Sequence, residues 1–185
     1  MNNFGSAPVC FIAPARTRHN TQLDSAQLSL GFAYLRCPCI SFIRQADMTP
    51  SRFEIIVDFA DCDPARIVFY PRYFDWFDRA TERMFRSRGM PWAQMFPEYR
   101  MAGVALVDAS ASFHGPSRFG DQIVIESWVG EWRSKVFVVE HRVHNKGNIV
   151  VEGREVRVWG LRDPANPEGL KAGVIPAEII ACFQD

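Results

Sequence analysis

The sequence lacks the features of membrane and nucleic-acid-binding proteins. No apolar run approaches the roughly 20 residues that a membrane-spanning helix requires. Neither sign of charge is in excess, since 21 basic residues stand against 21 acidic ones, and a balanced chain has no general attraction to polyanions. Glycine-rich phosphate loops and basic-aromatic repeats are also missing. We therefore expect no membrane and no nucleic acid among its partners.

Cysteine is sparse and metal-binding motifs are missing. The five cysteines are an odd number, and Cys37-Pro38-Cys39 is one residue too tight for the usual Cys-x-x-Cys pair. His141 and His144 fall on a strand pattern, and no His-x-x-x-His occurs on a helix. We expect no disulfide framework, no metal site and a reducing, cytoplasmic location.

The first 47 residues differ from the rest of the chain. They contain four arginines, two acidic residues and no lysine, and they show no sustained period of two or of 3.6. An organellar transit peptide fits this composition loosely. The alternative is a start site assigned too early, with translation beginning at Met48. Either way we expect residues 1–47 to form a poorly ordered leader and residues 48–185 to form one domain.

The domain shows one strand, one long helix and then consecutive strands. Apolar residues that alternate with mostly polar ones predict the first strand. A long helix is predicted from Pro71 to about Gly89, because Tyr73, Phe77, Ala80 and Met84 recur at helical spacing. Residues 90–100 suggest a loop or short helical turn, residues 163–169 a loop, and Pro176 the start of a terminal helix. The predicted strands are 52–59, 104–113, 122–128, 135–144 and 149–159, with a connection at 130–134. This order indicates an α+β fold in which the helix lies across an antiparallel sheet.

The loop between the first strand and the long helix contains Asp63 in the run Asp61-Cys62-Asp63-Pro64-Ala65. Amide groups at a helix start, including the Tyr70 N–H, have no partner in the helix and stabilise negative charge. Asp63 could attack a carbonyl polarised by such groups or activate a water molecule. The alternative is that Asp63 only caps its own loop.

The run Phe59-Ala60-Asp61-Cys62-Asp63-Pro64-Ala65, the run Ile67-Val68-Phe69-Tyr70-Pro71, the aromatic helix and Glu131-Trp132-Arg133 together resemble the 4-hydroxybenzoyl-CoA thioesterase family. The resemblance covers roughly residue 51 to the C-terminus. It implies the hotdog fold, with about five antiparallel strands wrapped around one long helix. It also implies that Asp63 is the catalytic aspartate. Related bacterial acyl-CoA thioesterases often carry histidine where this chain has Pro71, which favours the aromatic-substrate branch.

The resemblance also implies substrate-binding residues. A basic stretch after Glu-Trp, here Arg133, Ser134 and Lys135, would meet the phosphates of coenzyme A, with an ordinary solvated hairpin end as the alternative. Arg66 stands where many relatives have glycine, so a conformation open only to glycine is not expected there, and its charge could replace a phosphate contact. Asp78 could accept a hydrogen bond from a ring hydroxyl of the acyl group, or simply face solvent.

The sequence therefore predicts a thioester hydrolase that releases free acid and coenzyme A from an acyl-CoA, with an aromatic, hydroxybenzoyl-like acyl group favoured. Asp63 would act as nucleophile or general base, and the Tyr70 N–H would polarise the carbonyl. No cofactor is expected, because coenzyme A is part of the substrate, and a homodimer or homotetramer is expected because hotdog domains usually pair their sheets. The alternatives are a thioesterase for short or medium aliphatic acyl-CoA or acyl-carrier-protein substrates, and a non-catalytic acyl-CoA-binding protein.

Overall fold

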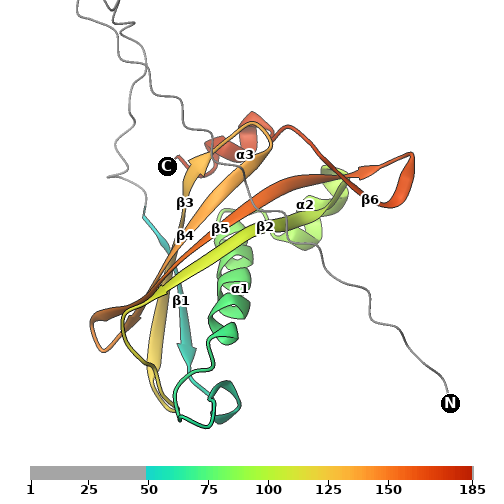
Figure 1. Ribbon diagram of the computed structural model, residues 1–185. Helices are drawn as coiled ribbons and strands as arrows, with labels where there is room; N and C mark the ends of the chain where they lie inside the picture. The colour runs from blue at the N-terminus through green and yellow to red at the C-terminus, as the bar shows by residue number, and fades with distance from the viewer. Residues whose placement is uncertain (1–48, 185) are drawn as a thin grey trace, which may run out of the picture. The chain divides into compact units, whose positions relative to one another are not determined.

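The computed structural model describes residues 49–184, so the leader predicted at residues 1–47 lies outside the described residues. The elements follow the predicted order of one strand, a long helix and consecutive strands (Figure 1). In chain order they are β1 (Ser51–Ile56), the 3₁₀ turn η1 (Phe59–Asp61), α1 (Pro71–Ser87), α2 (Trp92–Glu98), β2 (Met101–Phe113), β3 (Gln122–Trp132), β4 (Val136–Asn145), β5 (Asn148–Asp163), β6 (Asn166–Ala172) and α3 (Ala177–Ala181).

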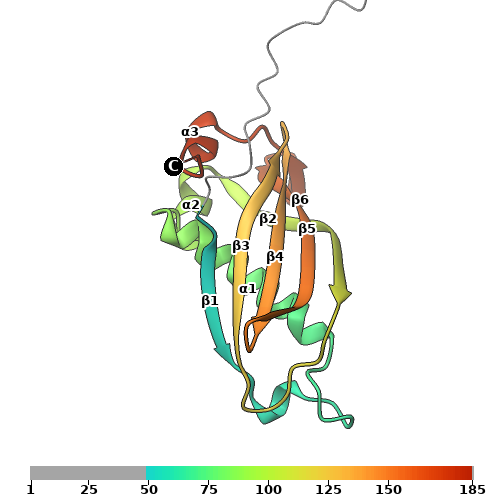
Figure 2. The same ribbon diagram turned by 90° about the vertical axis from the view of Figure 1, so that its left-hand side faces the viewer.

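The strands form one antiparallel sheet in the order β1-β3-β4-β5-β2, with β6 pairing to the end of β5. Figure 2 shows β1 and β2 at the two edges of the sheet and α1 running across one of its faces. The predicted α+β class is confirmed. The sheet has six strands instead of about five, because β6 adds a short strand that the sequence did not reveal.

Helix α1 is held by an apolar face that points at the sheet. Pro71 occupies its first turn, where a missing N–H costs no intrahelical bond, and Gly89 follows its end with a φ of 78°. The residues that the helix buries recur every three or four positions, namely Tyr73, Trp76, Phe77, Ala80, Thr81, Met84 and Phe85. The predicted helix from Pro71 to about Gly89 is therefore confirmed.

The helix approaches the sheet most closely where Phe77 crosses Gly153 of β5. A Cβ atom on Gly153 would lie 2.3 Å from a ring carbon of Phe77, so only glycine leaves room for the ring. The same ring stacks on the imidazole of His141, with centroids 4.5 Å apart. This contact fixes how far α1 stands from the middle of the sheet.

Three connections differ from the predictions or refine them. Residues 92–98 form a short helix, α2, which is one of the two outcomes expected. The connection predicted at residues 130–134 is shorter, because a register shift between Val129 and Glu131 lets β3 continue to Trp132. The loop predicted at residues 163–169 is wrong in its second half: the chain turns back at Asp163 and pairs with β5 from Asn166 onward.

The sheet has two distinct ends. The loop between β1 and α1 lies at one end, beside the connection from β2 to β3, and the β3–β4 turn lies at the other end with α3 (Figure 1). Two backbone hydrogen bonds record this arrangement: the Val68 N–H donates to the Ser117 carbonyl at 2.8 Å, and the Ile175 N–H donates to the Ser134 carbonyl at 2.9 Å. A site built around Asp63 therefore lies at the first end.

Candidate active site

Asp63 lies on a tight loop that closes on itself. The Asp63 N–H donates to the Ile67 carbonyl at 2.9 Å, and an isolated bridge joins Cys62 to Val68. The half-buried carboxylate accepts a hydrogen bond from the Ala65 N–H on Oδ1 at 2.8 Å. Within residues 49–184, Oδ2 makes no hydrogen bond, so one carboxylate oxygen holds the turn and the other is available for chemistry.

The same tripeptide occurs a second time and makes the same turn. In Asp163-Pro164-Ala165, the Ala165 N–H donates to Asp163 Oδ1 at 3.0 Å. An aspartate that binds the N–H two residues later is common turn chemistry. The cap interpretation therefore accounts for Oδ1 of Asp63 and says nothing about Oδ2.

Arg66 corrects one expectation. Its φ is 62°, in the left-handed region that glycine favours, so the position does adopt the backbone that the arginine was expected to exclude. A side chain in this region costs about 1–2 kcal/mol. Two hydrogen bonds of the turn hold Arg66 in this conformation: the Arg66 N–H donates to the Asp63 carbonyl at 2.8 Å, and the Asp63 N–H donates to the Ile67 carbonyl.

The start of α1 faces a groove of about 610 Å³ beside the Asp63 loop. Tyr70 is the residue that precedes the helix, and in the described part of the chain its N–H has no hydrogen-bond acceptor. Asp63 does not itself line the groove, but its loop neighbours do. The lining residues are Ile67, Val68, Tyr70, Tyr73 and residues 113–118, of which Tyr70 and Phe113 are largely exposed.

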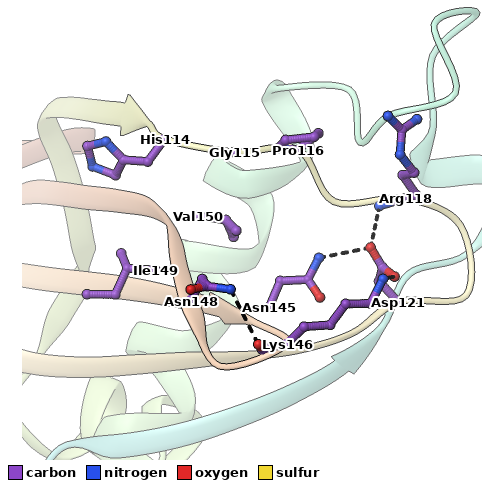
Figure 3. A pocket seen from close by; sticks show the side chains of 10 residues that line it. All are labelled: His114, Gly115, Pro116, Arg118, Asp121, Asn145, Lys146, Asn148, Ile149 and Val150. Atoms are coloured by element: carbon purple, nitrogen blue, oxygen red, sulfur yellow. Dashed lines mark hydrogen bonds and ion pairs between the residues drawn. The ribbon is translucent and has the colours of Figure 1, made fainter.

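Ser117 anchors the wall of this groove opposite the helix. Its carbonyl accepts from Val68, its hydroxyl accepts from Asn145 Nδ2 at 3.2 Å, and it also hydrogen-bonds the Tyr73 side chain. Burial raises the pKa of the Tyr73 hydroxyl, which therefore stays neutral. Asn145 Nδ2 also donates to Asp121 Oδ2 at 2.8 Å, as Figure 3 shows. The loop of Asp63, the helix and the sheet are thus joined through one buried serine.

Asp121 closes this network with charge. Lys146 Nζ lies 2.7 Å from its Oδ1, and the Arg118 backbone N–H donates to its Oδ2 at 2.9 Å (Figure 3). The hydrogen bonds from Lys146 and Asn145 lower the pKa of the Asp121 carboxyl from 3.8 to about 2. Because the folded pKa is lower, Asp121 stabilises the fold above pH 4, and this contribution disappears as the pH falls toward 2.

We expect Asp121→Asn to lower the free energy of unfolding at pH 7 by roughly 1–2 kcal/mol, because the amide loses the ionic contacts. The difference from the unaltered protein should shrink when urea unfolding is repeated near pH 3. Asp108→Asn is the control, because Asp108 is exposed and its ion pair with Arg154 is long at 3.7 Å. A gap that is the same at both pH values would show that the charge of Asp121 is not the source.

Asp78 lies on α1 and points to a buried cation. Its Oδ1 accepts from Arg157 Nη2 at 2.7 Å, while its side chain is 58% exposed. Neither of the two predicted alternatives included this contact. The carboxylate has one oxygen fixed from inside the protein and remains accessible from outside.

The residues predicted to hold phosphates lie far from Asp63 in the same chain. Arg133, Ser134 and Lys135 occupy the β3–β4 turn, and the length of β3 places them about 35 Å from the Asp63 end at 3.3 Å per residue. Arg133 forms a two-contact ion pair with Glu131, with both bonds at 2.8 Å. Within one chain the structure does not bring these residues to the groove, whereas it places exposed Arg66 and Arg118 beside it.

Comparison with known proteins identifies the family. The model of the thioesterase-like superfamily matches residues 57–163, which include the Asp63 loop, α1 and most of the sheet. The chain belongs to this thioesterase-like superfamily.

Two named relatives are similar over most of their lengths. The 4-hydroxybenzoyl-CoA thioesterase of Pseudomonas sp. (strain CBS-3) is 35% identical over 130 residues, which cover 67% of this chain and 90% of the relative. The structure of an aspartate-to-asparagine mutant of a 4-hydroxybenzoyl-CoA thioesterase, complexed with 4-hydroxybenzoyl-CoA, superposes with a TM-score of 0.67 at 34% identity, covering 72% and 97% of the two chains.

A third relative, the gentisyl-coenzyme A thioesterase BH1999, superposes with a TM-score of 0.62 at 29% identity, covering 71% and 98%. These matches confirm the predicted family, the hotdog fold and the class of thioester hydrolase. The roles of individual residues in this thioesterase remain predictions.

Sequence inspection missed several residues of this thioesterase that the fold brings together. Ser117, Arg118 and Asn145 come from a loop and a strand end, and no pattern marked them. Glu155 and Arg157 carried a signal, because strand alternation places them on the same face of β5 as Val151 and Trp159. Charged residues on a core face predict a buried ion pair.

Two further properties of the thioesterase concern residues 49–184. No three His, Cys, Asp or Glu side chains there lie close enough together to hold a metal ion. No helix in that range has the length and hydropathy needed to cross a membrane.

Proposed function

We propose that the enzyme hydrolyses acyl-CoA thioesters with an aromatic acyl group, using Asp63 and the start of α1. The observation that carries this proposal is the groove in which the Tyr70 N–H, without an acceptor in the described chain, stands beside the loop of Asp63. The names of the similar proteins support it, since 4-hydroxybenzoyl-CoA and gentisyl-CoA are both aromatic thioesters.

The chemistry follows from these two groups. The Tyr70 N–H donates to the thioester carbonyl oxygen and stabilises the negative charge that develops there. In the general-base route, Asp63 takes a proton from water while the water oxygen attacks the carbonyl carbon. The C–S bond then breaks, and the thiolate leaves with a proton returned from Asp63. In the nucleophilic route, the Asp63 carboxylate attacks the carbonyl carbon, and the C–S bond breaks as coenzyme A leaves as its thiolate. Water then hydrolyses the resulting mixed anhydride to the free acid and the Asp63 carboxylate, and its second proton goes to the thiolate or to solvent.

The spacing along α1 favours an acyl group with a hydroxyl at its far end. Asp78 follows Tyr70 by eight residues, which is about 12 Å along the helix axis and a net turn of about 80°. A para-hydroxybenzoyl group is about 6 Å long between its two oxygens, and a hydrogen bond of about 3 Å at each end brings the total to about 12 Å. A short acyl chain without a hydroxyl meets only the Tyr70 end.

The phosphates of coenzyme A require cations, and two sets are available. Exposed Arg66 and Arg118 lie at the groove, and Arg118 Nη1 donates to the Arg66 carbonyl at 3.4 Å. Arg133 and Lys135 would serve a groove only if a second copy brought them to it. Strand β2 is an edge in the described chain, and its small residues allow close pairing.

We propose that two copies pair through β2 and that active sites form at the pair. Light scattering at micromolar concentration should then give at least twice the chain mass. A monomeric mass, with full activity, would remove Arg133 and Lys135 from the site and leave Arg66 and Arg118 as the phosphate contacts.

A panel of thioesters tests the proposed function. We expect kcat/KM, measured by release of free coenzyme A thiol, to be at least about 10-fold higher for 4-hydroxybenzoyl-CoA than for benzoyl-CoA. Butyryl-CoA should be a poorer substrate than either. The highest value on butyryl-CoA or a butyryl carrier protein would instead favour the aliphatic alternative. Binding of coenzyme A with no thiol release from any substrate would indicate a non-catalytic protein.

A further inference from the structure

A cluster of polar and charged side chains lies buried between α1 and the sheet. Ser127, His141, Glu155 and Arg157 are each at most 2% exposed. Charged groups in the interior are unfavourable unless they are paired and hydrogen-bonded. The cluster therefore calls for an explanation, and the proposed chemistry of Asp63 does not use it.

One arm of the cluster has the order of a catalytic triad without access to substrate. Ser127 Oγ lies 2.8 Å from His141 Nδ1, and His141 Nε2 lies 3.3 Å from Glu155 Oε2. All three residues are at most 1% exposed, and Phe77 stacks flat on the imidazole. No substrate reaches this serine, so the arm supports Glu155 instead of acting as a nucleophile. Thr81 of α1 adds a hydrogen bond to Glu155 Oε2 at 3.0 Å.

The other arm is Arg157, whose guanidinium is fixed on three sides. Its Nε and Nη2 donate to the two oxygens of Glu155, both at 2.9 Å. Its Nη1 donates to the Val104 carbonyl of β2 at 3.3 Å. Its Nη2 also donates to Asp78 Oδ1 at 2.7 Å. Asp78, with a side chain 58% exposed, is the one member of the cluster that reaches the surface.

The charges of the cluster do not cancel. Glu155 and Asp78 bring two carboxylates, Arg157 brings one cation, and burial lowers the pKa of His141 so that it stays neutral. The one negative charge in excess is therefore best placed on Asp78, because its side chain is the one that solvent can reach. An arginine suits this arrangement because its rigid fork serves both carboxylates at once, which the single ammonium of lysine does not.

We propose that Arg157 is a positioning residue for acyl selection: it holds Asp78 Oδ1 from inside, so that Oδ2 faces the acyl group as a fixed, charged acceptor. This rests on the proposed function. A fixed carboxylate favours acyl groups that end in a neutral hydrogen-bond donor, such as a phenol. It disfavours acyl groups that end in a carboxylate, because like charges repel.

The test is a double-mutant cycle on substrate selectivity. The ratio of kcat/KM for 4-hydroxybenzoyl-CoA to that for benzoyl-CoA is measured for Asp78→Asn, Arg157→Lys and the double variant. We expect each single substitution to lower the ratio by about 10-fold, mainly by loss of the hydroxylated substrate. The double variant should show no further loss, because Arg157 acts through Asp78.

Two further variants keep the result interpretable. Arg154→Lys is the matched control, because it lies on the same strand with its side chain toward Glu140 and Asp108, and its ratio should not change. Should Arg157→Lys fail to fold, Arg157→Gln combined with Glu155→Gln removes the hold on Asp78 without leaving an unpaired buried charge. This variant should lose selectivity to the same extent.

Two outcomes would overturn the proposal. The first is a ratio that stays unchanged in folded Arg157 variants. The second is an equal loss on both substrates that adds to the loss from Asp78→Asn, which marks a purely structural role. Failure of the proposed function is separate, because it appears in the unaltered enzyme, either as absent thiol release on every substrate or as the highest kcat/KM on a butyryl thioester.

Discussion

Asp63→Asn is expected to lower kcat/KM for 4-hydroxybenzoyl-CoA by about 10²–10⁴-fold or more, because the amide can neither accept a proton from water nor act as a nucleophile. The fold should be almost unaffected. The asparagine Oδ1 still accepts from the Ala65 N–H, which is the hydrogen bond by which Asp63 holds its turn. Steady-state kinetics and urea unfolding of the same preparation measure the two effects separately.

The chain offers a matched control for this substitution. Asp163→Asn changes the same residue in the same Asp-Pro-Ala turn, with the same hydrogen bond to the residue two positions later, on the loop between β5 and β6. Both variants should change stability by a similar, small amount. Only Asp63→Asn should lose activity. Near-normal hydrolysis by Asp63→Asn would show that Asp63 only holds its turn and that another group at the groove acts as the base.

Arg157→Met is expected to lower the free energy of unfolding by about 3–5 kcal/mol. The substitution leaves the Glu155 carboxylate at 1% exposure without its cation, and removing one member of a buried ion pair leaves an uncompensated charge. It also removes the donors to Asp78 and to the Val104 carbonyl. Urea unfolding at pH 7 measures the loss.

Arg154→Met is the comparison, because Arg154 is three residues from Arg157 on β5 but makes longer contacts of 3.6 Å and 3.7 Å at a partly exposed site. It should cost less than about 1 kcal/mol. If the two variants lost equal stability, burial of the Arg157 ion pair would not be the cause of its contribution to the free energy of unfolding. Adding Glu155→Gln to Arg157→Met should restore part of the stability, because no buried charge then remains unpaired.

Much of the fold followed from local patterns in the sequence. The alternation before Asp63 predicted β1, the spacing of Tyr73, Phe77 and Met84 predicted α1, and Pro71 and Gly89 predicted its two ends. These elements can be predicted from the sequence because each buries one face, and burial of one face makes apolar residues recur with the period of the helix or strand. The catalytic role of the Asp63 loop was predicted because its residues resemble those of a known family.

The remaining features depend on contacts between distant residues. Strand β6 has no alternating apolar pattern, and it pairs only with the end of β5. The φ of Arg66 is imposed by hydrogen bonds around the turn, which override the preference of its side chain. The position of Arg133 relative to Asp63 depends on the length of β3 and on which end of the sheet each residue occupies. Such facts belong to topology and cannot be derived from a local window.

The open edge of β2 has a consequence for how this protein must be handled. Within residues 49–184, the thirteen residues of β2, Met101–Phe113, pair with a strand on one side only, and Leu106 and Val107 are about half exposed. Such an edge can pair with any extended segment that it meets, so the pairing of two copies proposed above competes with aggregation when the chain refolds. Dilution slows both reactions. A charged residue introduced on this edge would therefore improve recovery from denaturant while weakening the proposed pairing through β2.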